Sequence, residues 1–235
     1  MIVIIDGDGL VWSSAFNQDS LKIAKDKFVE KVNDVLNAIN DDVDIDEVIM
    51  CNGSKNNFRK SLNSSYKANR KSTKPKLLGE LHEWVKEEYN SYWGDGVETD
   101  DVVATLWKKI VDENGVDSCL IVSQDKDYKQ FNCWYFDHYY KRFNLSKISK
   151  EDALRNFYTQ MIVGDSADNV NYCKGYGLSY CNKVFENVTS EFGYIRRVYY
   201  LYKKLYEESS KDKFIECYKL LKLKTDSDSE IRRGL

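Results

Sequence analysis

Four short stretches of the chain are almost wholly apolar. They cover residues 2–5, 47–52, 118–123 and 133–137 and are rich in Ile, Val and aromatic side chains. Runs of this length are typical of strands buried on both faces, as in a parallel sheet. The first three runs end in polar residues: Asp6, Asn52, and Ser123 followed by Asp125. Open α/β sheets place their sites beyond the carboxyl ends of such strands, so these residues are candidates for one common site.

Between these runs, apolar residues recur at the spacing of an amphipathic helix. The segments with this pattern are residues 10–16, 21–39, 75–89, 99–111, 150–163 and 190–224. Pro75 would take the first helical position, which proline favours, and Ser149 would cap the helix that follows it. The alternation predicts an α/β fold with a mostly parallel, twisted sheet flanked by helices. We expect one domain over residues 1–225 and a frayed tail over residues 226–235.

Length and composition narrow the class of protein. The 235 residues are 42% hydrophobic and 14% aromatic, which is enough for a sizeable core. No run approaches the ~20 apolar residues of a membrane span, so we expect no membrane partner. Residues 1–6 predict a first strand and not a signal peptide. None of the six cysteines forms a C-x-x-C pair, and Cys51, Cys119 and Cys133 lie in or beside apolar runs, as buried thiols do. We therefore expect a reduced, cytoplasmic protein, in the host cytoplasm if it is phage-encoded.

Acidic residues gather at several predicted element ends. Glu98, Asp100 and Asp101 fall in the first turn of the helix over residues 99–111. An acidic N-cap is the ordinary explanation, because a helix start favours negative charge. Similar clusters elsewhere favour a functional explanation, and they contain Asp6, Asp125, Asp127, Asp165 and Asp168. Carboxylates collected from distant segments repel one another unless a cation lies between them, which predicts a metal site.

Basic residues are concentrated in one window, although the net charge is −3. Residues 55–76 contain no acid and hold Lys55, Arg59, Lys60, Lys67, Arg70, Lys71, Lys74 and Lys76. A solvated charged loop is one interpretation. The other is a segment that grips phosphates, with Tyr66 available to stack on a base. Gly175 and Gly177, ahead of a helix with Lys183, could also present backbone N–H groups to a phosphate, although a G-x-G turn alone is weak evidence.

Six motifs in order resemble the 5′-nuclease (flap endonuclease) superfamily. They are Asp6 at the first strand end, Phe58-Arg59 with Tyr66-Lys67-Ala68-Asn69-Arg70, Glu98-x-Asp100-Asp101, Ser123-x-Asp125-Lys126-Asp127, Gly164-Asp165-x-x-Asp168-Asn169, and Gly175-x-Gly177. Over residues 1–190 the chain is most similar to small phage 5′–3′ exonucleases and to the nuclease domain of bacterial DNA polymerase I. The resemblance implies a PIN-like nuclease core with a helical arch near residues 53–76. It also implies a helix–three-turn–helix region over residues 164–190, followed by C-terminal helices over residues 190–224.

The resemblance also implies residue roles. The first metal position would be lined by Asp6, Glu98, Asp100 and Asp101, and the second by Asp125, Asp127, Asp165 and Asp168. Lys67 and Arg70 would be catalytic groups on the arch, close to the scissile phosphate. Further DNA contacts would come from Arg59, Tyr66, Lys71, Gly175, Gly177 and Lys183. The implied cofactors are two Mg²⁺ ions, or Mn²⁺, and in this family the glycine turn often holds K⁺.

One position departs from the family pattern. Asn52 stands where the family usually has an Asp that ends the second strand. An amide can bind Mg²⁺ or its water but brings no charge, so we expect a weakened first metal position if Asn52 faces it. Asn52 could instead face away and cap the following turn. Asp8 is an additional acid near the same place, and its role stays open at this stage.

The expected function is metal-dependent 5′–3′ exonuclease or 5′-flap endonuclease activity in replication or repair. The substrate would be DNA with a 5′ end or a 5′ flap, and the protein is expected to be a monomer. A PIN-like ribonuclease is an alternative, although it would lack the arch and the glycine turn. A DNA-binding structural protein with impaired catalysis is another, supported only by Asn52. Exonuclease against endonuclease preference, and DNA against RNA in the cleaved strand, stay open.

Overall fold

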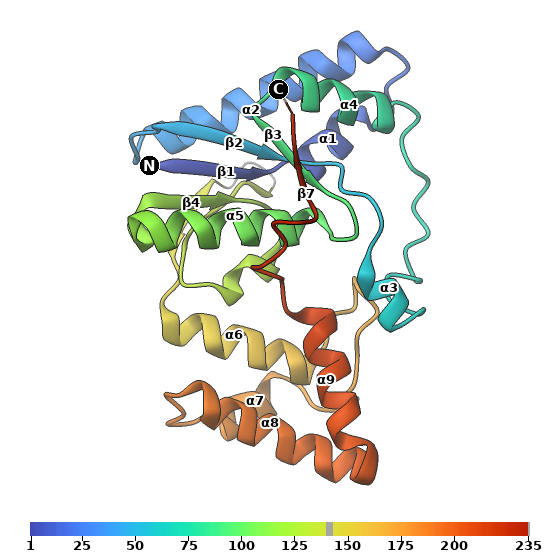
Figure 1. The fold of residues 1–235 in the computed structure, drawn as a ribbon, viewed down its shortest axis with the longest axis vertical. Coiled ribbons are helices and arrows are strands. Elements are labelled where there is room, and N and C mark those ends of the chain that lie inside the picture. Colours follow the sequence, from blue (N-terminus) through green and yellow to red (C-terminus); the bar gives the residue numbers. More distant parts are fainter. Residues whose placement is uncertain (140–142, 235) are drawn as a thin grey trace.

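The computed structural model describes residues 1–139 and 143–234. Its sheet has the strand order β6-β5-β4-β1-β2-β3-β7, and Figure 1 labels β1 to β4 and β7. The strands are β1 Ile2–Asp6, β2 Glu47–Cys51, β3 Ser91–Gly94, β4 Cys119–Val122, β5 Trp134–Asp137, β6 Asn144–Lys147 and β7 Ile231–Arg233. The five inner strands are parallel, and β6 and β7 are antiparallel edges. The predicted mostly parallel sheet is therefore confirmed.

Helices cover both faces of the sheet. They are α1 Asp8–Ala15, α2 Leu21–Asn40, α3 Phe58–Leu62, α4 Leu78–Glu88, α5 Thr99–Asn114, α6 Lys150–Val163, α7 Leu178–Val184, α8 Glu191–Tyr206 and α9 Ser210–Leu221. In Figure 1, α1, α2 and α4 lie above the sheet and α5 lies below it. Alternation along β1 explains this, since Val3 and Ile5 pack with the first group whereas Ile4 packs with α5. No described helix combines the length and apolar character that a membrane crossing requires.

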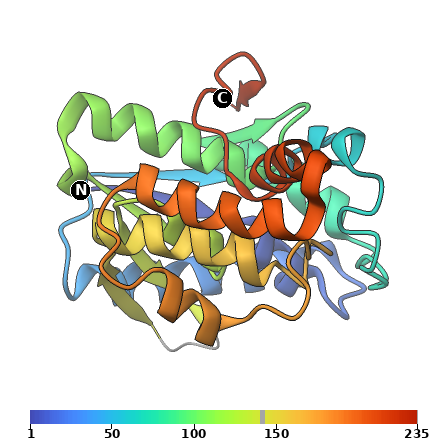
Figure 2. The ribbon, with the colours of Figure 1, turned by 90° about the horizontal axis from the view of Figure 1, so that it is seen from below.

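A second hydrophobic cluster holds the C-terminal helices together. It joins α6, α7, α8 and α9 around buried residues such as Phe157, Val198 and Leu220. Figure 2 shows α6 and α8 side by side beneath the sheet, with α9 beside them. Tyr66, from the basic segment, is buried in the same cluster. The cluster thereby ties that segment to the C-terminal helices.

Three local predictions need correction. The helix expected from Pro75 begins at Leu78, and the Pro75 carbonyl instead accepts the Leu78 N–H in a turn. The basic insert contains only the five-residue helix α3, with turns and extended chain after it. The expected frayed tail contains β7, which pairs with β3. The tail is ordered because β3, which the apolar pattern did not reveal, offers it an edge to pair with.

The predicted burial of Cys51, Cys119 and Cys133 is confirmed. All six cysteines are free and buried. Burial raises the pKa of Cys119 and Cys133 to about 12, so these thiols stay protonated and unreactive at neutral pH. They act as small apolar side chains of the core.

Candidate active site

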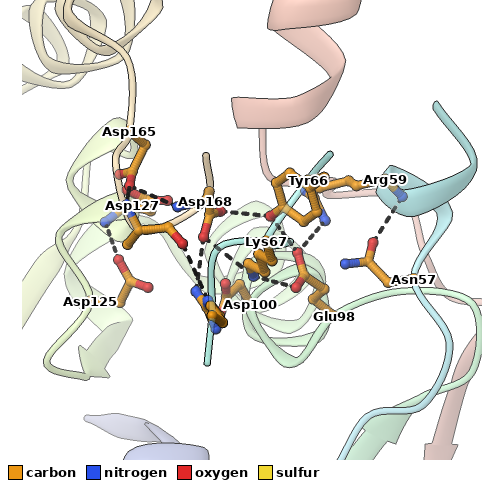
Figure 3. A network of polar contacts seen from close by, with 12 residues as sticks. Asn57, Arg59, Tyr66, Lys67, Glu98, Asp100, Asp125, Asp127, Asp165 and Asp168 are labelled. Carbon is orange, nitrogen blue, oxygen red and sulfur yellow. Dashed lines mark hydrogen bonds and ion pairs between the residues drawn. The ribbon is translucent and has the colours of Figure 1, made fainter. Parts of the chain in front are cut away.

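A cavity of about 490 Å³ opens beyond the carboxyl ends of β1 and β4. Its lining includes eight carboxylates: Asp6, Asp8, Glu98, Asp100, Asp125, Asp127, Asp165 and Asp168. Seven of these are among the eight predicted metal-site residues, and Asp8 is the additional one. The basic residues in the lining are Lys67, Arg70, Lys126 and His138. Figure 3 shows side chains from separate segments of the chain meeting here.

Sheet register brings the first acids together. Ile5 pairs with Val122, so Asp6 and the loop after β4 leave the sheet side by side. The Ser123 hydroxyl donates a hydrogen bond to Asp6 Oδ2 at 3.0 Å. Asp125 then caps the short 3-10 helix Lys126–Gln130, because its Oδ1 accepts the Asp127 N–H at 2.9 Å. The two aspartates, two residues apart, thus form the turn and also place two carboxylates in one cavity.

The turn after α6 supplies two further acids. Gly164 has φ +82°, and a Cβ there would lie 2.3 Å from the Val170 carbonyl oxygen, so only glycine fits. Asp165 and Val170 pair across this turn through both backbone hydrogen bonds. Asp165 Oδ1 also accepts N–H groups from Ala167 and Asp168, at 2.8 and 3.2 Å. The Gly-Asp-x-x-Asp motif is therefore a rigid turn that faces both carboxylates into the cavity.

The carboxylates are crowded enough to resist ionisation. Burial, together with the charges of Asp8 and Asp125, raises the pKa of Asp6 to about 7. Burial and the charges of Asp125 and Asp165 raise the pKa of Asp127 to about 7 as well. The pKa of Asp100 is raised well above its usual range by burial and by Asp125 and Asp6. Such shifts mark a place where added positive charge is strongly favoured.

Because these pKa values are raised, the metal-free protein should become less stable as the pH rises. Between about pH 4 and 7 the folded protein holds protons that the unfolded chain has lost, so the free energy of unfolding falls as pH rises. In EDTA, we expect the melting temperature to be lower at pH 8 than at pH 5, by ~2–4 °C for each kcal/mol lost. Mg²⁺ at pH 8 should restore it. Calorimetry on wild type and Asp6→Asn checks this, since the variant should show a shallower slope. A melting temperature that rises with pH in EDTA would contradict the assignment.

Basic groups from the insert contact the acids directly. Lys67 Nζ forms an ion pair with Glu98 and lies 3.7 Å from Asp168 Oδ1. Arg70 Nη2 lies 2.9 Å from the same Asp168 oxygen. Burial alone would lower the pKa of Lys67, but the charges of Glu98, Asp100 and Asp168 raise it, so the lysine stays cationic. The structure thus places both predicted catalytic cations on the cavity wall.

The predictions that Asp101 binds metal and that Arg59 contacts DNA are wrong, because these two residues form a buried ion pair with each other. Asp101 is 0% exposed and does not line the cavity. Arg59 is 1% exposed, and its guanidinium binds Asp101 through two bonds of 2.6 and 2.7 Å. Asp101 is therefore not placed as a metal ligand, and Arg59 cannot face DNA. The Glu98-x-x-Asp101 spacing could have revealed the structural role of Asp101, because these two residues form a capping box at the start of α5.

Arg59 also joins distant parts of the chain. Its Nε donates to the Leu220 carbonyl and its Nη2 to the Lys222 carbonyl, both at 2.9 Å. Its Nη1 also reaches Glu98 Oε2 at 3.1 Å. The guanidinium thereby fixes the insert to the start of α5 and to the end of α9.

The prediction that Tyr66 stacks on a base is also wrong. Tyr66 is 3% exposed, and its hydroxyl lies 2.6 Å from Asp168 Oδ2 and 2.9 Å from Glu98 Oε2. Figure 3 shows it between these two acids. Its hydroxyl thereby links an acid of the first predicted metal position to an acid of the second. The other proposed DNA contacts, Lys71, Gly175, Gly177 and Lys183, are all exposed. Their contact with DNA stays a prediction, as does K⁺ at the glycine turn.

Several positioning residues were not foreseen from the sequence. The Tyr128 hydroxyl lies 3.1 Å from Asp6 Oδ2 and 3.3 Å from Asp100 Oδ1. Gln160 Nε2 donates to Asp127 Oδ1 at 2.8 Å and to Asp165 Oδ2 at 3.2 Å. Lys126 Nζ lies 2.8 Å from Asp165 Oδ2. Only Lys126 had a local signal, as the basic residue inside Asp-Lys-Asp.

The donor chemistry fits a hard divalent cation. The lining carboxylates offer oxygen ligands alone, which suit Mg²⁺ or Mn²⁺. Among residues 1–139 and 143–234, no three His, Cys, Asp or Glu side chains already converge as a finished metal cage. Cationic Lys67 and Lys126 lie among the carboxylates, which shows that positive charge is accommodated there. Side-chain rotations at these acids would therefore accompany metal binding.

Comparison with known proteins agrees with this geometry. The chain is 29% identical over 193 residues to the flap endonuclease Xni of Shewanella woodyi, covering 76% of this chain and 75% of that protein. It is 25% identical over 225 residues to a 5′-3′ exonuclease of Buchnera aphidicola, covering 84% and 75%. The structure resembles the D15 protein of bacteriophage T5, co-crystallised with metal ions, with TM-score 0.63, 14% identity and coverage of 94% and 99%.

A more distant structure shares the fold. The catalytic core of Rad2, solved with a DNA substrate, has TM-score 0.53 and 10% identity, with coverage of 93% and 71%. At the level of sequence, residues 1–158 match the model of the 5′-3′ exonuclease N-terminal resolvase-like domain. That match spans strands β1 to β6, the basic insert, and the acids at the end of β1, after β4 and at the start of α5. The chain therefore belongs to the 5′–3′ exonuclease family of the 5′-nuclease superfamily.

Proposed function

We propose that this protein hydrolyses phosphodiester bonds in DNA that carries a 5′ end or a 5′ flap, with Mg²⁺ or Mn²⁺ as cofactor. The observation that carries the proposal is the cavity in which eight carboxylates meet Lys67 and Arg70. A metal-attracting site beside phosphate-attracting cations supports phosphodiester hydrolysis better than either group alone. The protein is proposed to act as a monomer, since one chain supplies all these groups.

Two sets of acids would hold the metals. Asp6, Glu98 and Asp100 would serve the first position, and the second would use the four aspartates from the loop after β4 and the turn after α6. Bound divalent ions activate a water and stabilise the leaving oxygen. Tyr128, Tyr66 and Gln160 hold the carboxylates in place for this purpose.

Lys67 and Arg70 are proposed to bind the reacting phosphate. Each already lies against an acid, so the phosphate would compete with Glu98 and Asp168 for these cations. A contact that forms as charge develops on the phosphate lowers the barrier more than it strengthens binding.

A second, larger cavity supports a path for the nucleic-acid strand. It measures about 1030 Å³ and shares Lys67, Arg70 and Glu98 with the acidic cavity. The remaining basic side chains in its lining are Lys55, Lys60 and Lys74 from the insert. A phosphate backbone lying along these cations would be led to the carboxylates.

Cleavage of a labelled 5′-flap DNA tests the proposal. Product is expected with Mg²⁺ and none with EDTA. A flap of the same sequence made of RNA tests the alternative, because faster cleavage of the RNA flap would indicate a ribonuclease. Binding of the flap without cleavage in Mg²⁺ or Mn²⁺ would favour a DNA-binding structural protein and overturn the proposed activity.

Lys67→Ala is expected to slow the chemical step by ~10²–10³-fold, or ~2.7–4 kcal/mol, with a smaller effect on DNA affinity. The reason is that its contact with phosphate strengthens towards the transition state. Single-turnover rates at saturating enzyme measure this directly. Lys109→Ala is the matched control, because Lys109 is an exposed lysine of α5 that lines neither cavity. An unchanged rate with weaker affinity would make Lys67 a docking residue only.

A further inference from the structure

Strand β1 ends in the carboxylate Asp6, whereas strand β2 is followed by the uncharged Asn52. Asn52 follows β2, is 0% exposed and does not line the acidic cavity. Neither atom of its side-chain amide has a hydrogen-bond partner within the described structure. The strand end where we expected a metal-facing residue therefore contributes no charge to the cavity, and its side chain is buried beside Gly7.

Asp8, the first residue of α1, does line the cavity. Its Oδ1 accepts the Gly53 N–H at 2.7 Å, and its Oδ2 accepts the Thr99 hydroxyl at 2.8 Å. Gly53 directly follows Asn52, and Thr99 directly follows Glu98. These two neutral donors fix the carboxylate between the end of β2 and the start of α5.

The held carboxylate keeps capacity for a further ligand. Each ionised carboxylate oxygen can accept more than one interaction, and the Asp8 side chain is 47% exposed. The nearest basic atom in contact is His82 Nδ1, at 4.0 Å. No lysine or arginine in residues 1–139 and 143–234 forms an ion pair with Asp8, unlike Glu98, Asp165 and Asp168.

Asp8 also belongs to the first metal position by location. Its backbone N–H lies 3.3 Å from Asp6 Oδ1, and it shares the cavity lining with Glu98 and Asp100. We propose that Asp8 supplies the carboxylate charge of the first divalent-cation position that Asn52 does not supply. The carboxylate would thus come from the first turn of α1 instead of from the end of β2. This inference rests on the proposed metal-dependent function.

Isothermal titration of the full chain with Mg²⁺ and with Mn²⁺, without DNA, tests the proposal independently of cleavage. Asp8→Asn keeps the shape of the side chain and removes its charge. It should weaken one of the two binding events at least ~10-fold. Asp8→Ser is a second charge-free variant and should lose the same affinity. The matched control is Asp112→Asn in the last turn of α5, which removes an exposed carboxylate outside the cavity. Melting curves in EDTA verify that each variant is folded.

The variant Asn52→Asp provides a second test, namely whether a charge at residue 52 can reach the metal position. Because residue 52 is buried and does not line the cavity, an added carboxylate should not tighten metal binding and should lower the melting temperature. Wild-type affinity in both Asp8 variants would overturn the proposal, and so would tighter binding by Asn52→Asp. If the wild-type protein binds neither cation, the proposed function itself fails. The two failures are therefore distinguishable.

Discussion

Asp125→Asn is expected to reduce cleavage of a 5′-flap DNA in Mg²⁺ by more than ~10³-fold and to leave DNA affinity largely intact. Asn keeps the oxygen that accepts the Asp127 N–H, so the turn should survive. What is lost is a charge of the second metal position, and metal ions supply several kcal/mol of transition-state stabilisation. The phosphate contacts come from Lys67, Arg70 and the insert, so binding should not suffer and can strengthen as repulsion falls.

Asp117→Asn is the matched control for this experiment. Asp117 precedes β4 and Asp125 follows it, so the two variants remove one carboxylate from opposite ends of the same strand. Asp117 is exposed, is paired with Lys147 and does not line the cavity. Single-turnover cleavage and a binding titration in Ca²⁺ separate the two effects. An Asp125→Asn protein that cuts at the wild-type rate would refute the metal assignment.

Arg59→Met is expected to be the most destabilising single change at the site. It leaves Asp101 as an unpaired charge at 0% exposure, which costs ~3–5 kcal/mol when a buried ion pair loses one partner. At ~2–4 °C per kcal/mol, the melting temperature should fall by about 6–20 °C. Lys60→Met is the matched control, because Lys60 is the exposed neighbour on the same short helix.

A double-mutant cycle tests whether the pair is responsible. Arg59→Met with Asp101→Asn removes both charges and should recover part of the stability lost by Arg59→Met alone. Urea unfolding of the four proteins gives the coupling free energy. Additive losses would show that Arg59 stabilises the protein through its carbonyl contacts at residues 220 and 222 and not through Asp101.

The sequence predicted the strand ends well because the signal there is local. An apolar run followed by Asp6 or by Asp125 specifies both the strand and the edge at which it ends. The glycine turn at Gly164 is equally local, since a positive φ and a close carbonyl demand glycine. These two features account for five of the eight carboxylates in the cavity, and the acidic first turn of α5 accounts for Glu98 and Asp100.

The errors arose where distant partners decide the outcome. Arg59 and Lys67 look alike in the basic window, yet Arg59 is buried because Asp101 and the carbonyls after α9 surround it. Tyr66 is buried because the C-terminal helices provide an apolar cluster for its ring. Strands β3 and β7 each need the other for part of their hydrogen bonds, and neither has a marked apolar run. No window of sequence contains such information.

The Arg59 contacts have a consequence for how the nuclease is made. Its partners at Leu220 and Lys222 lie 161 and 163 residues further along the chain. Ribosomes deliver the chain from its N-terminus, so the carboxylates and the basic insert emerge long before these carbonyls. We therefore expect a nascent chain to leave Arg59 and the buried Asp101 without their full set of partners until synthesis reaches this region. DNA-cutting capacity would then arise late, in finished molecules and not in partly translated ones.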